Sequence, residues 1–197
     1  PMRELVYYVA TSIDGYIADP SGGYGTFPME GDHMAAVMDE YADALPGHVL
    51  DALGIEAPGT RFDTVILGWN TLRPALEIGI ESPYPHLRQF VASRSERRVA
   101  DGVTLTDDPV RAVRELKRED GLPIWLCGGG DLAGSLLSEI DRLILKRNPV
   151  VFGAGIPLFG NAAYNPMPFV PTDARRFESG VTIEELVRGA ERDPGGV

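Results

Sequence analysis

Cysteine is almost absent from this chain of 197 residues, in which Cys127 is the only one. A single cysteine excludes an intrachain disulfide and a metal cluster built on cysteines. Histidine is also scarce, and His33, His48 and His86 do not follow the spacing of metal ligands. We therefore expect no metal site, and the lack of disulfides favours a cytoplasmic protein.

The sequence also lacks a long hydrophobic run and an excess of positive charge. No uncharged apolar stretch approaches the ~18–20 residues that a membrane helix requires, and the first residues show no signal-peptide pattern. Lysine and arginine together number 18 against 29 acidic residues, which gives a net charge of −11. Because such a surface repels phosphate backbones and anionic lipids, we expect neither nucleic acid nor a membrane as a partner.

Hydrophobic residues make up 44% of the chain and charged residues 24%, as in ordinary soluble domains. We expect a single domain over residues 1–197, with a core of about 3–188 and a frayed tail at 192–197. Short apolar runs typical of buried strands alternate with helical patterns. These runs cover residues 5–10, 64–68, 89–93, 123–127 and 143–145, with further strands at 103–105 and 181–187. The alternation predicts an α/β fold with a central, mainly parallel sheet flanked by helices.

The strongest local signal for a ligand is the segment from Ile124 to Leu132, in which a strand, three glycines and a helix start follow one another. Glycines let a backbone approach a ligand closely, and free amides at a helix start attract anions. The spacing is neither that of a Rossmann fingerprint nor that of a P-loop. Taken alone, the segment is explained equally well as a tight strand-to-helix turn without a ligand.

A second signal follows the first strand, where residues 12–18 read Ser-Ile-Asp-Gly-Tyr-Ile-Ala. In open α/β sheets, ligands bind outside the carboxyl ends of the strands. This rule would place Asp14 beside residues 68–71 and 93–94. Asp14 and Gly15 also suit an ordinary turn, which is the simpler interpretation of that dipeptide alone.

Five short motifs occur in a fixed order along the chain. They are Ser-x-Asp-Gly-x-Ile-Ala at 12–18, Leu-Gly-x-x-Thr at 67–71, Val-x-Ser-Arg at 91–94, Gly-Gly-Gly-x-Leu at 128–132 and Pro-Val-x-x-Gly-x-Gly-x-Pro-Leu-Phe at 149–159. In this order they resemble the dihydrofolate-reductase-like superfamily. The resemblance is closer to the C-terminal reductase domain of the bifunctional riboflavin-biosynthesis deaminase/reductase and its stand-alone relatives. It spans about Arg3 to Arg188 and is specific for the superfamily rather than for one substrate.

The resemblance implies an NADPH-dependent reductase whose cofactor lies across the carboxyl edge of the sheet. It implies that Ala10 and Ile17 flank the nicotinamide, and that Ser93 and Arg94 lie near the adenosine 2′-phosphate. The pyrophosphate would be held from two sides, by Gly68, Trp69, Asn70 and Thr71 and by Gly128, Gly129, Gly130, Asp131 and Leu132. Helix starts with free amides and local arginines suit such a diphosphate.

One position departs from the family pattern. The family usually has Gly-Arg-x-Thr after the second strand, with the arginine at the cofactor's phosphate, whereas this chain has Gly-Trp-Asn-Thr at 68–71. Tryptophan can stack on adenine but cannot form a bidentate pair with a phosphate. Either Arg94, Arg97 or Arg98 takes over the 2′-phosphate, or the preference for NADPH is weakened, or cofactor binding is lost.

The substrate side is less determined. Asp14 is the candidate catalytic residue, either orienting a substrate hydroxyl or assisting proton delivery. Dihydrofolate reductases place an acidic residue on the first helix, near the pterin. The corresponding segment here offers Asp32, Asp39, Glu40 and Asp43, each of which also suits a solvated helix face.

We therefore expect an NADPH-dependent reductase that transfers hydride to a small heterocycle of pteridine or pyrimidine type. A dihydrofolate reductase is the alternative within enzymes. A non-catalytic nucleotide-binding protein that retains the fold is the alternative outside them. The resemblance also implies a homodimer, for which the aromatic and proline-rich segment 163–169 is a candidate contact, although a loop packed on its own core fits that segment equally well.

Overall fold

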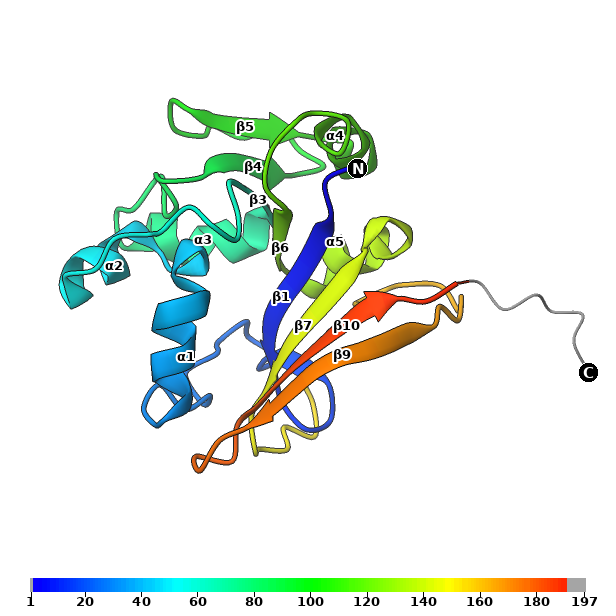
Figure 1. Cartoon of the computed structure of the whole chain (residues 1–197). Helices are drawn as coiled ribbons and strands as arrows, with labels where there is room; N and C mark the ends of the chain where they lie inside the picture. The colour runs from blue at the N-terminus through cyan, green and yellow to red at the C-terminus, as the bar shows by residue number, and fades with distance from the viewer. Residues whose placement is uncertain (1, 191–197) are drawn as a thin grey trace, which may run out of the picture.

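A sheet of eight strands forms the centre of the protein in the computed structural model, which describes residues 2–190 (Figure 1). The strands follow the order β5-β4-β3-β6-β1-β7-β10-β9. Neighbouring strands from β5 to β7 run parallel, and β10 pairs antiparallel with both β7 and β9. The predicted α/β class and mainly parallel mixed sheet are thereby confirmed. The fraying expected at 192–197 lies outside the described residues.

The elements alternate along the chain as the sequence predicts. The strands of the sheet are β1 (Leu5–Thr11), β3 (Thr64–Gly68), β4 (Arg88–Ala92), β5 (Val103–Thr106), β6 (Ile124–Gly128), β7 (Arg142–Arg147), β9 (Phe169–Arg176) and β10 (Thr182–Arg188). A separate ribbon joins β2 (Tyr16–Ala18) to β8 (Ile156–Pro157). The helices are α1 (His33–Glu40), α2 (Gly47–Leu53), α3 (Trp69–Glu77), α4 (Pro109–Leu116) and α5 (Gly130–Ser135), with short 3₁₀ turns η1 (Ala42–Ala44) and η2 (Leu137–Glu139).

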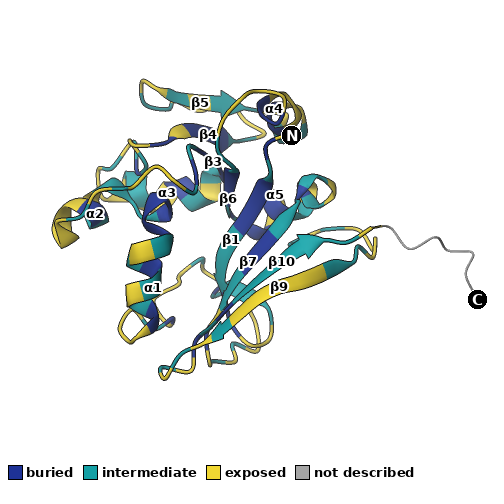
Figure 2. Ribbon diagram, in the orientation of Figure 1, coloured by how far each residue is buried: buried dark blue, intermediate teal, exposed yellow. Residues whose placement is uncertain are grey.

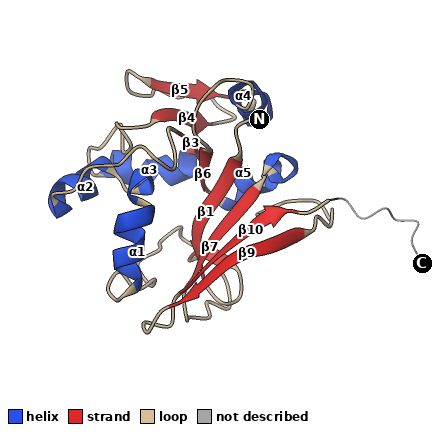
Figure 3. Ribbon diagram, in the orientation of Figure 1, coloured by secondary structure: helices blue, strands red, loops and turns tan. Residues whose placement is uncertain are grey.

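The central strands bury side chains on both faces because helices flank the sheet on either side (Figure 2, Figure 3). On one face, Leu5 and Tyr7 of β1 belong to a core that includes residues of α4 and α5. On the other face, Val6 of β1 packs in a core with Tyr41, which follows α1, and Leu72 of α3. Burial on both faces explains why β1 reads as a continuous apolar run rather than an alternating one.

The start of α1 is fastened to the turn between β9 and β10. The Asp32 carboxylate accepts hydrogen bonds from the backbone amides of Glu178 at 2.7 Å and Ser179 at 3.0 Å. The ring Nδ1 of the buried His33 lies 2.9 Å from the Ser179 hydroxyl. Because that turn follows the end of β9 and leads into β10, these contacts hold the first turn of α1 at the edge where β7 ends (Figure 1).

One edge of the sheet lies outside the sequence prediction. The strand β9 was not expected, and it covers an edge of the sheet with mostly exposed residues. The segment 163–169 precedes it, and Tyr164 there is 95% exposed. This exposure is compatible with the expected homodimer contact, which stays a prediction. No helix within residues 2–190 has the length and apolar character to cross a membrane.

Candidate functional site

The carboxyl ends of β3 and β6 bring two glycine segments side by side. The two strands are parallel neighbours, with Leu67 opposite Gly128. A β-carbon placed on Gly68 would lie 3.7 Å from both the Gly128 carbonyl oxygen and the Gly129 nitrogen. The fold therefore brings together two segments, residues 68–71 and residues 128–132, at the carboxyl edge of the sheet. They are 57 or more positions apart in the sequence.

The three glycines after β6 have different surroundings. No protein atom lies within 4 Å of the place where a β-carbon on Gly128 would stand, and a β-carbon on Gly129 would meet only the Thr71 hydroxyl, at 3.3 Å. A β-carbon on Gly130 would instead collide with the carbonyl oxygen of Pro157. The half-buried Gly129 therefore leaves room for a ligand, the buried Gly128 has a φ of +133° that favours glycine, and Gly130 is needed for packing within the protein.

Two helix starts at this edge have no side-chain cap. Gly68 is the N-cap of α3 and Gly129 that of α5, and neither end receives a side-chain hydrogen bond. Uncapped amides at a helix start attract anions. The residues after Gly129 make contacts within the protein. Leu132 is buried in the core, and the exposed Asp131 carboxylate accepts a hydrogen bond from Asn161.

The loop after β4 reaches the same place through an arginine. The guanidinium carbon of Arg97 lies 4.9 Å from the centre of the Trp69 ring, a cation–π contact. Arg94 is exposed, and the Ser93 hydroxyl bonds locally with the backbone of Ser95. Trp69 is thus covered by an arginine from the neighbouring loop.

Ala10 and Ile17 occupy the adjoining part of this edge. Leu5, Val6 and Tyr7 are 0–2% exposed, Tyr8 to Ala10 are half-buried, and Thr11 at the end of β1 is buried again at 3% exposure. The half-buried Ile17 lies in β2, which the Ser12-to-Tyr16 backbone hydrogen bond of 2.8 Å holds close to the end of β1. The sheet surface around Ala10 is therefore only partly covered by the protein.

Asp14 fastens two loops together. Its carboxylate accepts hydrogen bonds from the Ser12 hydroxyl at 2.6 Å and from the amides of Phe152 at 3.0 Å and Gly153 at 2.8 Å. These donors, Ser12 foremost and then Phe152, lower the pKa of Asp14 to about 2. A carboxylate with so low a pKa is ionised at neutral pH, so it has no proton to deliver. The expected role in catalysis stays untested, and the contacts favour a structural one.

The loop contact of Asp14 predicts a pH-dependent loss of stability. Because the pKa is lowered on folding, the carboxylate stabilises the fold above about pH 4, and this contribution is lost as the pH falls towards about 2. We expect Asp14→Asn to lower the melting temperature at neutral pH, and the gap from wild type to close between about pH 4 and 2. Thermal melts across this range test it. The exposed Asp107→Asn is the control, and a gap independent of pH would contradict the assignment.

Three of the four acidic residues offered as candidates near the substrate bind other groups. Asp32 binds the β9–β10 turn, and Glu40 pairs with Arg175. Asp43 is buried and accepts hydrogen bonds from four backbone amides at 59–62. Asp39 is exposed. The expectation that one of them contacts substrate, in the manner of dihydrofolate reductases, therefore has no support among the described contacts.

One residue beside Ala10 was missed by the sequence analysis. Lys146 lies on β7 directly opposite Ala10 of β1. A lysine at the end of a strand gives no local signal, because only the pairing of two strands 136 positions apart brings it to this edge.

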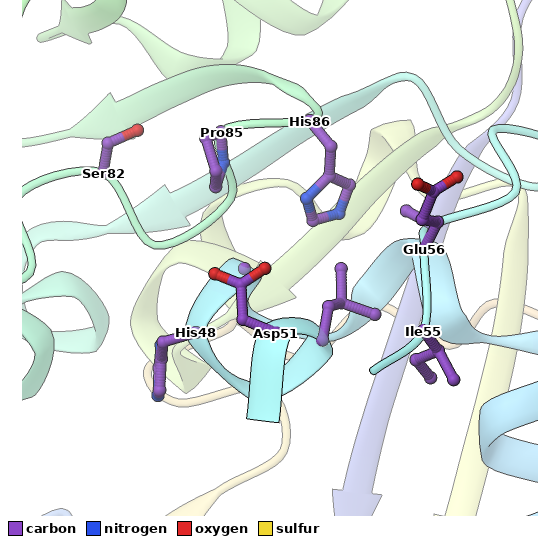
Figure 4. Close-up of a pocket in the computed structure, with 10 residues that line it drawn as sticks. His48, Asp51, Ile55, Glu56, Ser82, Pro85 and His86 are labelled. Carbon is purple, nitrogen blue, oxygen red and sulfur yellow. The ribbon is translucent and has the colours of Figure 1, made fainter. Parts of the chain in front are cut away.

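A pocket of about 440 Å³ lies elsewhere, between α2 and the loop before β4 (Figure 4). Its lining includes His48, Asp51, Glu56 and His86. His86 is engaged, with its Nε2 2.9 Å from the Asp43 carbonyl oxygen. Within residues 2–190, no group of three or more His, Cys, Asp or Glu side chains is arranged to hold a metal ion. The pocket contains none of the residues expected to bind the cofactor.

Comparison with known proteins places these observations in a family. The model of the RibD C-terminal domain matches residues 3–183. An uncharacterized protein of Bacillus subtilis (strain 168), YwjB, is 33% identical over 164 residues, which cover 80% of this chain and 83% of YwjB.

Solved structures share the fold at low sequence identity. A candidate riboflavin biosynthesis protein from Shewanella sp. PV-4 has a TM-score of 0.69 at 23% identity, covering 95% of this chain and 99% of that one. Dihydrofolate reductase from Enterococcus faecalis, complexed with NADP(H), has a TM-score of 0.63 at 16% identity. The match covers 95% of this chain and 97% of that one. A TM-score of 0.63 at 16% identity is also found for the diaminohydroxyphosphoribosylaminopyrimidine deaminase/5-amino-6-(5-phosphoribosylamino)uracil reductase of Thermotoga maritima. That match covers 95% of this chain and 57% of that one.

Proposed function

Because this chain belongs to the RibD C-terminal domain family, we propose that it is a reductase that uses NADPH to reduce a small heterocycle of pteridine or pyrimidine type. The observation that carries the proposal is the meeting of two glycine segments at the carboxyl edge of the sheet, beside the uncapped start of α3. The similar fold of a dihydrofolate reductase that binds NADP(H) supports the choice of cofactor.

The residues at this edge fit a dinucleotide. Gly129 leaves space where a side chain would otherwise stand, and the α3 amides after Gly68 are free to bind a diphosphate. Arg97, which lies over Trp69, and Arg94, three positions before it, would hold the 2′-phosphate. When bound, the cofactor supplies the hydride.

The protein's own contribution is to position the two rings and to exclude water. Ala10 offers a small side chain in the half-buried part of β1, where a flat ring can lie close to the sheet. The Asp14 contacts to Phe152 and Gly153 hold the neighbouring loops in place. Asp14 acts in this proposal as a positioning residue rather than as a proton donor.

Dihydrofolate reductase is the less favoured alternative within the fold. The acidic residues on and after α1 are engaged with Arg175, the β9–β10 turn and the 59–62 backbone, or are exposed. A non-catalytic nucleotide-binding protein remains the alternative outside enzymes, favoured by Trp69 in place of the family's arginine. The Arg97 contact to Trp69 argues against it, since it supplies a positive charge at the same place.

We expect NADPH to bind more tightly than NADH, and Arg94→Ala to weaken NADPH by about ten- to hundredfold while sparing NADH. A charged hydrogen bond to the 2′-phosphate is worth ~1.5–3 kcal/mol, and NADH lacks that group. Quenching of tryptophan fluorescence, to which Trp69 would contribute, reports both titrations. Arg111→Ala on α4 is the matched control, and Arg97→Ala tests the second arginine.

Equal losses for the two cofactors would assign Arg94 to the shared diphosphate or to folding. If neither NADPH nor NADH bound to the protein, the proposed function itself would be contradicted. Where NADPH binds, its oxidation is followed by absorbance with a panel of pteridines and pyrimidines. Binding without turnover on any of them would favour the non-catalytic alternative.

A further inference from the structure

Lys146 faces the side of the sheet that α1 covers. It follows Ile144 by two positions on β7 and lies opposite Ile183 of β10, and both isoleucines belong to the core on that side. Side chains two apart on a strand, and side chains directly paired across strands, share a face. The lysine side chain therefore leaves the sheet on the same face as Tyr8 of β1 and beside Ala10.

Other cations at comparable positions have carboxylate partners. On the same strand, Arg142 pairs with Glu4 and Glu185, and Arg147 pairs with Glu184. The other lysine of the chain, Lys117, lies 2.7 Å from the Asp141 carboxylate. Lys146 has neither an ion pair nor a side-chain hydrogen bond among residues 2–190. In a chain with 29 acidic residues, a half-buried lysine without a carboxylate partner is unusual.

Burial makes this ammonium receptive to a ligand. Loss of hydration lowers the pKa of Lys146, because an ammonium half removed from water loses solvation that no protein carboxylate replaces. An anionic oxygen next to it would restore that stabilisation. Three carboxylates on the elements around this face, those of Asp32, Glu40 and Glu185, are bound to other groups.

We propose that Lys146 is a specificity-determining residue, and that its ammonium binds an anionic oxygen carried by the heterocyclic ring of the substrate. This inference rests on the proposed function, which sets the nicotinamide at Ala10, the direct neighbour of Lys146. The part of the site that would hold the substrate then has the positive charge of Lys146 from the sheet, and no acidic residue of α1 faces it. Such a site favours a ring bearing a carboxylate or oxyanion over a neutral or protonated ring.

Matched pairs of ring compounds test the proposal. Uracil and orotate differ by one carboxylate, as do pterin and pterin-6-carboxylate. Calorimetric titration of the full chain without cofactor measures the affinity of each compound. In at least one pair, we expect the affinity of the wild type for the anionic compound to exceed its affinity for the neutral compound by about tenfold or more. Lys146→Met should abolish this preference, and Lys146→Arg should retain much of it.

Arg147→Met is the matched control, because it removes a positive charge from the adjacent position on the opposite face of β7. The control should keep the preference, and all variants should keep the wild-type melting temperature within a few degrees. A wild type without preference in both pairs, or a Lys146→Met variant that keeps it, would overturn the proposal.

The cofactor titration separates this result from the proposed function. If NADPH binds normally but the anion preference is absent, the assignment of Lys146 is wrong and the reductase proposal stands. If the preference depends on Lys146 but NADPH does not bind, the anion site stands and the reductase proposal fails.

Discussion

Gly130→Ala is expected to destabilise the protein by about 3 kcal/mol or more, because a single methyl group would collide with backbone. The added β-carbon would run into the Pro157 carbonyl oxygen and would lie 3.3 Å from the Gly160 nitrogen. Gly130 has no positive φ, so the loss would come from the collision rather than from backbone strain.

The neighbouring backbone cannot move aside cheaply. Pro157 lies in β8 and pairs with Tyr16 of β2. The next residue, Leu158, donates its amide to the Gly15 carbonyl at 3.0 Å and accepts a hydrogen bond from the Tyr7 hydroxyl at 2.9 Å. A shift of Pro157 would therefore disturb the β2–β8 ribbon and its attachment to β1.

Urea unfolding of Gly130→Ala and Gly129→Val compares the stability of the two variants. Gly129 has extended backbone angles, φ −82° and ψ −164°, and its β-carbon would meet only the Thr71 hydroxyl. We expect Gly129→Val to fold with near wild-type stability and to bind NADPH at least ~tenfold more weakly, a loss of about 1.4 kcal/mol. A Gly130→Ala protein with the wild-type urea midpoint would contradict this division of the glycines.

Asp43→Ala is expected to cost at least ~3 kcal/mol, since its buried carboxylate binds four backbone amides. The acceptor distances are 2.7 Å to Gly59, 2.7 Å to Arg61, and 3.0 and 3.1 Å to the two remaining amides, those of Thr60 and Phe62. Asp43 is only 1% exposed, so little water can replace these bonds when the carboxylate is removed.

A loss of this size lowers the melting temperature by roughly 6 °C or more in a domain of this length. Asp43→Asn keeps one acceptor oxygen and should fall between the wild type and Asp43→Ala. Asp39→Ala, at an exposed position of the same segment, is the control and should melt within about 1 °C of wild type, as surface substitutions do. If Asp43→Ala melted like this control, the carboxylate would not hold the 59–62 backbone.

The sequence by itself determined the α/β class, most strands of the sheet and the place of the glycine turn. Continuous apolar runs such as residues 5–10 and 64–68 identify strands buried on both faces, because parallel strands covered by helices have no polar side. The three glycines at 128–130 follow a strand and precede a helix, and local chemistry suffices to recognise that turn. The edge strand β9 was missed because its exposed residues, Asp173 and Arg176 among them, carry no apolar pattern.

The tertiary structure alone decided which side chains are free to act. Asp14, Asp32 and Asp43 looked like candidate functional carboxylates, yet each is bound by donors that lie elsewhere in the chain, up to 147 positions away for Asp32 and Ser179. Lys146 looked like an ordinary strand-end lysine, yet its neighbours across the sheet leave it without a side-chain partner in the part of the chain that the structure describes. Hydrogen bonds and ion pairs act over a few ångströms in space, so their partners depend on strand order and register, which local sequence patterns do not specify.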